Sequence, residues 1–467
     1  MNFNSSEFAL FLPIVLFLYA AVFRSERLRD GLLLIASYIF YMAWYWQYAG
    51  LIALSTCFDY YIGRRMAGEE RIKIRKLLLI ISLVINLGIL ATFKYFNFFA
   101  GTTQHALNSL GIDIPLLHLN LLLPVGISFY TFQTLSYTID IYRRRINPEN
   151  NFVKFALFVS FFPQLVAGPI VRAAEFLPQL HRTPNVTQEK FTYGLQLVFL
   201  GLFKKVVVAD LLAHLAVDAV FSNPAAHSSL DLLMALYGYA FQIYCDFSGY
   251  SDIAIGAAAM FGFVLPQNFN RPYISQNARE FWTRWHITLS TWLRDYLYIS
   301  LGGNRKTKIR VLFNLMITML LGGLWHGAAL NFVLWGGYHG LLLVFAHLFG
   351  KKSEVTFTIQ KIFRQVLTFH LIVFGWLLFR VSSMQNFTDY IKGLFRLDFA
   401  THLSPLFYAI LLLAILMHLI PRPFVEKRVL NTFGLQPAFI QAGVYAGAIL
   451  LFLGLTLDAP SFIYFQF

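Results

Sequence analysis

Charged side chains are scarce in this chain of 467 residues, because Asp, Glu, Lys and Arg together make up only 13% of it. Soluble domains carry about 25% charged residues, so most of this chain cannot form a water-facing surface. Hydrophobic residues reach 58%, against roughly 45–50% in soluble domains, and the mean hydropathy is +0.60. The composition excludes an ordinary soluble domain and predicts an all-α polytopic membrane protein.

Cysteine is also nearly absent. The only two, Cys57 and Cys245, both lie in apolar stretches, which excludes a disulfide framework and a cysteine-based metal site. No phosphate-binding loop, dinucleotide fingerprint or zinc signature occurs, so we expect no metal and no tightly bound cofactor. Residues 1–7 lack the basic region and cleavage site of a signal peptide, and we expect residues 8–23 to form a retained first helix.

The formal charge of +14 comes from basic residues in short stretches between apolar runs, which is typical of cytoplasmic loops and not of a nucleic-acid-binding surface. We therefore expect the loops at 24–29, 64–76 and 143–145 to face the cytoplasm and the N-terminus to face outward. Two crossings must then lie between residues 32 and 62, with a turn near Ala49. The loop after Phe99 should be external. The apolar runs predict about eleven or twelve crossings in one integral domain, residues 1–467.

Residues 280–303 form the segment with the densest pattern. If they are one helix, apolar residues at intervals of three or four form a single stripe: Trp282, Trp285, Leu289, Trp292, Tyr296 and Ile299. His286 lies at the border of that stripe, beside Ser290 and Leu293. Such a helix suits either a protein-lined funnel or an interface at which tryptophans anchor it and His286 forms the polar edge.

His326 lies in the apolar run GGLWHG, residues 322–327, where a titratable side chain is costly. The neighbouring Gly322, Gly323 and Gly327 allow close backbone approach and a loosened helix. A neutral imidazole is the form that a general base needs. The alternative is a structural histidine that bonds across helices, since other apolar stretches also contain histidine: His339, His347, His370 and His418.

Two carboxylates, Asp246 and Asp252, lie six residues apart in another apolar segment. On a helix they point in different directions, so they do not predict a paired acid–base site. We expect each of them to pair with an arginine or a backbone donor.

Several segments together carry a family resemblance: 162–170 (FPQLVAGPI), 246–252 (DFSGYSD), 268–273 (NFNRPY), 280–282 (EFW), 285–296 (WHITLSTWLRDY), 301–305 (LGGNR), 322–327 (GGLWHG) and 462–467 (FIYFQF). The chain resembles the membrane-bound O-acyltransferases, and within them the bacterial branch that serves alginate O-acetylation. Relatives in that branch acetylate other exopolysaccharides, and the teichoic-acid D-alanylation proteins are more distant.

The resemblance implies a helical ring around a thin centre, with cytoplasmic and periplasmic funnels that meet at a histidine. His326 corresponds to the near-invariant catalytic histidine of the family and His286 to a second polar position. The catalytic core should span about 160–345. Residues expected to bind substrate or support the pocket are Trp325, Trp285, Asp246, Asn270, Ser290, Arg294, Asp295, Tyr296 and Asn304.

The implied activity is acetyl transfer from a cytoplasmic thioester, acetyl-CoA or an acyl carrier protein, across the inner membrane to periplasmic acetyltransferase partners that modify alginate. Other polymers are alternatives: cellulose, peptidoglycan, or teichoic acid through D-alanylation. A secondary transporter would also place titratable residues in the membrane, but we find no matched pair of broken helices in two halves of the chain. A noncatalytic scaffold of a secretion complex is the third possibility.

Overall fold

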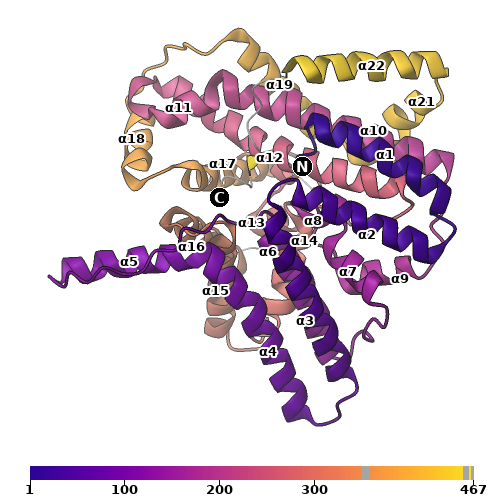
Figure 1. Ribbon diagram of the computed structural model, residues 1–467. Helices are drawn as coiled ribbons and strands as arrows, with labels where there is room; N and C mark the ends of the chain where they lie inside the picture. The colour runs from indigo at the N-terminus through magenta and orange to yellow at the C-terminus, as the bar shows by residue number, and fades with distance from the viewer. Residues whose placement is uncertain (350–357, 456–461, 464–467) are drawn as a thin grey trace.

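The computed structural model describes residues 1–349, 358–455, 462 and 463, and every regular element in these ranges is a helix (Figure 1). The all-α prediction is confirmed. Residues 464–467 of the closing FIYFQF segment lie outside the described residues. Residues 351–361 have the composition most typical of a linker, and most of them also lie outside the described residues.

The N-terminal part is built from helical hairpins. α2 and α3 lie between the first two basic loops, as expected, and the turn between them ends at Tyr48. Figure 1 shows α3 and α4 side by side, with α5 extending away from the end of α4. The helices are α1 (Ser6–Val22), α2 (Glu26–Met42), α3 (Ala49–Ala67), α4 (Ile72–Leu90), the π-helical η2 (Ala91–Tyr95) and α5 (Phe96–Ser109).

The loop that we expected to begin directly after Phe99 begins later, because α5 continues as a helix to Ser109. No proline interrupts it before Pro115. The helix ends at Ser109, two residues before Gly111, whose φ of 77° is the left-handed conformation that terminates many helices. The external side of this segment stays a prediction.

The centre of the molecule is formed by two helices that are buried over almost all of their length. α6 (Ile127–Tyr142) packs against α3 and α4. α12 (Ser229–Met260) packs against α10 (Gln188–Leu202) and the π-helical η3 (Phe203–Asp210).

Glycines set the distance between α10 and α12. Gly194 faces the backbone of Gly256, and Gly201 faces that of Gly249, so a Cβ atom at any of the four would clash with the opposite helix. Small residues at such crossings let membrane helices approach closely.

The remaining helices complete the chain. They are α7 (Phe152–Ser160), α8 (Phe162–Leu165), α9 (Ala173–Leu180), η4 (Ala213–Val217), α11 (Asp218–Ser222), α13 (Ala278–Arg284), α14 (Ile287–Trp292), η7 (Leu293–Tyr298), α15 (Lys308–His326), α16 (Leu330–Phe349), α17 (Thr358–Arg380), α18 (Met384–Leu394), α19 (Pro405–Leu419), α20 (Arg422–Phe424), η8 (Val425–Leu430), α21 (Asn431–Gly434) and α22 (Ala438–Leu455), with short 3-10 turns at η1 (Trp46–Tyr48), η5 (Pro224–Ala226) and η6 (Pro272–Ile274).

Within the described residues, five helices are long and apolar enough to cross a bilayer, or six if the bent pair around residue 420 is one span. This is fewer than eleven or twelve, because several of the apolar runs form short helices, carry charges or are interrupted by π-helical turns. The larger number of crossings stays a prediction.

Candidate active site

α15 ends at His326 and packs closely against α16. A Cβ atom on Gly323 would clash with the carbonyl of Phe332, and one on Gly327 would clash with the ring of Phe332. Gly327 is extended, with φ −160° and ψ 150°, so the chain leaves the helix directly after the histidine. The close approach and the loosened helix that the glycines predicted are both present at Gly323 and Gly327.

The His326 side chain lies among aromatic rings and is 5% exposed. Its ring centre lies 5.0 Å from that of Trp325, 5.0 Å from that of Trp335 and 5.4 Å from that of Phe379. The rings of Trp335 and Phe379 meet that of His326 nearly edge-on, which restricts how far it can turn.

A lysine fixes the C-terminal end of α15. The Lys94 ammonium group donates to the carbonyl oxygens of Trp325 at 2.7 Å and His326 at 3.0 Å, and it lies 3.4 Å from the Ser128 hydroxyl. The last carbonyls of a helix have no partner within the helix and carry partial negative charge, so a cation there is stabilising. Lys94 belongs to η2, and the π-helical turn changes the direction of its side chain relative to α4.

Two cavities reach the C-terminal end of α15. The smaller, of about 90 Å³, is lined by His326, Trp325, Lys94, Trp44 and residues 123–129. Since a water molecule takes up about 30 Å³ in the liquid, this cavity holds only a few waters or a group of similar size. The larger, of about 650 Å³, is mostly apolar, is lined by parts of α4, α6, η7 and α15, and includes Trp325 and Arg143. Trp325 therefore borders both cavities.

His286 occupies a break between α13 and α14, with φ 40° and ψ 56°. The prediction of one continuous helix over 280–303 is therefore wrong. A left-handed conformation is costly for a residue with a Cβ atom and persists only where its surroundings enforce it.

The segment around Asn268 enforces this conformation through backbone pairing. Asn270 N–H donates to the Arg284 carbonyl, and Ile287 N–H donates to the Asn268 carbonyl, both at 2.9 Å. The Asn268 side-chain oxygen also accepts from the Thr288 hydroxyl at 3.0 Å. The fully buried His286 is thus held from both sides of the break.

The two histidines lie on the same aromatic wall. The ring centre of Trp325 is 6.0 Å from that of His286 and 5.0 Å from that of His326. Phe247 meets the His286 ring at 4.6 Å, and Phe129, which borders the smaller cavity, lies 6.3 Å from it. The structure therefore brings together the two histidines that the sequence singled out, with Trp325 between them.

The two aspartates of α12 form buried ion pairs with consecutive lysines of η3. Asp246 lies 2.6 Å from Lys205 and accepts from the Ile463 backbone N–H, while Asp252 lies 2.6 Å from Lys204. Asp252 also lies 3.6 Å from Arg422. An arginine or backbone partner is thus present for each, but the principal partners are lysines, whose long side chains the π-helical turn directs toward α12.

A further group of predicted site residues lies around Asp295, near the part of the larger cavity that is away from Trp325. Asp295 pairs with Arg172 at 2.8 Å and with Arg294 at 2.6 Å, and Tyr296 donates to Asp140. Burial opposes the charge of Asp295, but the hydrogen bonds from Arg294 and Arg172 hold the pKa of its carboxyl below the usual value. Of the residues expected to support the pocket, Arg294, Asp295 and Tyr296 therefore form a charged cluster at a distance from the histidines.

The remaining predicted site residues have other partners. Trp285 is fully buried against Trp376, with ring centres 4.7 Å apart, and its carbonyl accepts from Ser290. Asn270 forms one of the backbone hydrogen bonds that hold the break at His286, and it also lines a different cavity. Asn304 lies in the exposed loop after η7, where its side chain accepts from Tyr298.

Sequence reasoning missed Lys94 and the role of Asn268. Lys94 is the only charged residue in the apolar run at 77–99, and a charge inside a membrane-length run is a signal that could have identified it. The pairing of Asn268 with residues around His286 depends on tertiary contact, and no local pattern indicates it.

Comparison with known proteins identifies the family of this chain. The sequence model of the membrane-bound O-acyltransferase family matches residues 51–387. A probable alginate O-acetylase, AlgI, of Pseudomonas aeruginosa is 45% identical over 390 residues, which cover 82% of this chain and 73% of the relative. A peptidoglycan O-acetyltransferase of Helicobacter pylori is 37% identical over 393 residues, which cover 78% of this chain and 73% of the relative.

A teichoic acid D-alanyltransferase of Bacillus subtilis is 29% identical over 279 residues, which cover 56% of this chain and 69% of that protein. The resemblance seen in the sequence motifs is confirmed. The chain belongs to the membrane-bound O-acyltransferase family and is a membrane acyltransferase of the alginate O-acetylase type.

Proposed function

We propose that His326 is the general base of an acetyl transfer from a cytoplasmic thioester to a hydroxyl on the periplasmic side of the inner membrane. The observation that carries this proposal is the position of His326, at the end of α15, where the small cavity meets the tryptophan that borders the large one. A histidine enclosed by packing on all sides could not perform this reaction.

The assignment of sides rests on the basic loops. Arg143 lines the large cavity and belongs to the basic run at 143–145, so that cavity opens toward the cytoplasm by the positive-inside rule. The small cavity is lined by Trp44 and residues 123–126. Trp44 follows the end of α2 that is away from the basic loop at 24–29, and residues 123–126 precede the end of α6 that is away from the basic run at 143–145. The N-terminus then faces the periplasm.

The chemistry requires one proton acceptor that later becomes a proton donor. The neutral imidazole of His326 takes the hydroxyl proton as the hydroxyl oxygen attacks the thioester carbonyl. The tetrahedral intermediate collapses, its carbon–sulfur bond breaks, and the imidazolium returns the proton to the leaving thiolate. His286, on the other side of Trp325, positions the acceptor or donates to the oxyanion, whose stabilisation is usually a large contribution.

The large cavity suits the donor. Its walls are mainly apolar, and Arg143 at its end donates to the Ser300 hydroxyl at 2.8 Å and to the Asp295 carbonyl at 3.1 Å. Arg172 and Arg294 lie close to Arg143, because both of them form ion pairs with Asp295. An entrance with several arginines favours a donor that carries phosphate groups, as acetyl-CoA and the prosthetic group of a carrier protein both do.

The names of the relatives support the proposed acceptor. Those named as acting on alginate cover the largest share of this chain, so we propose alginate as the final polymer, reached through periplasmic acetyltransferase partners. The small cavity holds only a few waters, which suits a single hydroxyl-bearing side chain or sugar edge better than a polymer strand. Peptidoglycan is the alternative that a relative's name supports.

The proposal is tested with the purified chain in sealed vesicles, sorted by orientation, with acetyl-labelled thioester supplied on one face only. We expect free thiol on the face that exposes Arg143 and labelled acetyl on an acceptor protein enclosed on the opposite face. A transporter would leave the thioester intact, and a scaffold would leave the label in the donor. Either result would contradict the proposal.

A further inference from the structure

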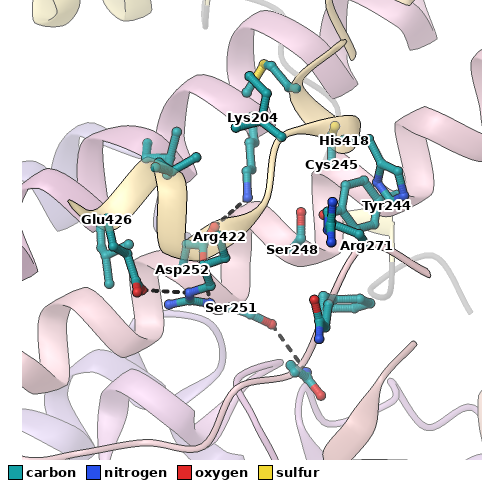
Figure 2. A pocket seen from close by; sticks show the side chains of 18 of the residues that line it. Lys204, Tyr244, Cys245, Ser248, Ser251, Asp252, Arg271, His418, Arg422 and Glu426 are labelled. Carbon is teal, nitrogen blue, oxygen red and sulfur yellow. Dashed lines mark hydrogen bonds and ion pairs between the residues drawn. The ribbon is translucent and has the colours of Figure 1, made fainter. Parts of the chain in front are cut away.

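A separate cavity of about 260 Å³ lies between α12, η3, α19 and η8 (Figure 2). At about 30 Å³ for each water, its volume corresponds to several water molecules. It lacks both His286 and His326, and its walls from α19 and η8 lie outside residues 51–387, which the family model matches. The cavity is therefore separate from the candidate active site.

The charged side chains that line the cavity do not balance. Three are cationic, Lys204, Arg271 and Arg422, and two are carboxylates, Asp252 and Glu426 (Figure 2). Lys204 lies 2.6 Å from Asp252, and Arg422 lies 2.8 Å from Glu426. Both carboxylates are thereby neutralised. In the described part of the chain, no carboxylate lies within ion-pair distance of Arg271, whose guanidinium donates to the Leu419 carbonyl.

Two donors at this cavity are buried with no acceptor. His418 is 3% exposed, and its Nε2 accepts from the Tyr273 backbone N–H at 3.1 Å. In a neutral imidazole the hydrogen then sits on Nδ1. Among the described residues, neither this Nδ1 nor the Nε of Arg271 has a hydrogen-bond partner. A buried donor without an acceptor is costly, so a bound acceptor would be stabilised here.

The cavity adjoins a second one of about 440 Å³, with which it shares Ile255, Asn270, Arg422 and Glu426. That second cavity is lined by residues 262–265, beyond the end of α12. Tyr19 donates to the carbonyl of Phe261 there, at the end of α1 that precedes the basic loop at 24–29. A ligand would therefore enter from the side that we predict to be cytoplasmic.

The remaining walls are mainly apolar, with side chains from α10, α19 and η8 such as Leu197, Leu200, Ala414, Met417, Val425 and Val429. We propose that this cavity binds a phosphate group, with Arg271 and His418 as its donors. Arginine matches the geometry of phosphate oxygens, and the unpartnered donors supply the remaining hydrogen bonds. The phosphate is either that of a phospholipid whose chain follows the apolar walls or a free phosphate.

Binding to the full-length protein in detergent tests this assignment, with inorganic phosphate and a short-chain lysophosphatidate as probes. Wild-type protein should bind saturably. Arg271→Gln and His418→Phe should each raise the dissociation constant by about tenfold or more, as expected when a hydrogen bond to a charged group is lost. Arg310→Gln, which changes an exposed arginine on α15, is the matched control and should bind as the wild type does.

The two probes distinguish the sources of the phosphate. Tighter binding of lysophosphatidate would identify a lipid, and equal binding of both would identify free phosphate. The proposal is overturned if neither probe binds saturably, or if Arg310→Gln weakens binding as much as Arg271→Gln does. Acyl transfer is not measured, so the result does not depend on the role of His326.

Discussion

Lys94 donates a hydrogen bond to the backbone carbonyl of His326 across 3.0 Å, although 232 residues separate them in the sequence. The same ammonium group donates to the carbonyl of Trp325 at 2.7 Å. These bonds tie the end of α15 to η2 and fix where the histidine leaves the helix. The position of the proposed base therefore depends on a residue that takes no part in the proton transfer.

Replacing Lys94 should reduce acyl transfer more than it reduces the amount of folded protein. Lys94→Met removes both bonds to the end of α15 and keeps a side chain of similar length, so we expect the rate constant to fall by about tenfold. Transfer rates normalised to folded protein measure this. Lys73→Met, at an exposed position near the start of α4, is the control. Equal rates for both variants would show that Lys94 does not position His326.

The left-handed backbone of His286 predicts an unusual order of stability. Glycine adopts φ 40° without strain, whereas alanine there pays roughly 1 kcal/mol or more. We expect His286→Gly to unfold at the same temperature as His286→Ala or a higher one, while both lose transfer activity. Thermal unfolding of the two purified variants gives the order.

Thr283, an exposed residue inside α13, provides the matched pair. In a right-handed helix glycine is about 1 kcal/mol less favourable than alanine, so Thr283→Gly should unfold below Thr283→Ala. If His286→Ala also proved more stable than His286→Gly, the strained turn would not be a property of the protein.

The contact between α15 and α16 allows almost no added volume. A Cβ atom on Gly336 would clash with the Met319 carbonyl, so Gly336→Ala must push the two helices apart. Overpacking of this kind costs about 1–3 kcal/mol, and we expect a lower unfolding temperature together with reduced transfer. Gly443→Ala, on α22 with nothing within 4 Å of the new atom, should unfold at the wild-type temperature or above it, because alanine favours a helix more than glycine does. Equal stability of the two variants would rule out the close contact.

Much of the fold was predictable because it follows from composition and periodicity. The all-α class, the hairpin of α2 and α3, and the long α12 all follow from apolar runs and basic loops. The predicted helix lengths were wrong where π-helical turns or a break interrupt the regular helix. The π-helical turns at η2, η3 and η7 have no simple sequence signal, and the break at His286 is set by hydrogen bonds that Asn268 accepts from Ile287 and that Asn270 donates to Arg284.

The site was predictable in part for the same reason. His286 and His326 stand out as titratable residues in apolar surroundings, and both lie beside Trp325. Arg294 and Asp295 were expected at the pocket through the family resemblance, and the structure places them in ion pairs around Asp295 and Arg172 instead. The break at His286 and the π-helical turn of η7 separate these residues from His286, and the local sequence pattern indicates neither.

The central claim is that His326 performs the proton transfer. The measurement that tests it most directly is the rate of thioester consumption in a single turnover by equal amounts of folded wild-type and His326→Ala protein. General base catalysis contributes about 100- to 10,000-fold, so we expect the variant to lose at least about 100-fold. His370→Ala, at an exposed histidine that bonds Tyr237, should keep a rate within about twofold. A His326→Ala variant that consumes the thioester at the wild-type rate would contradict the account.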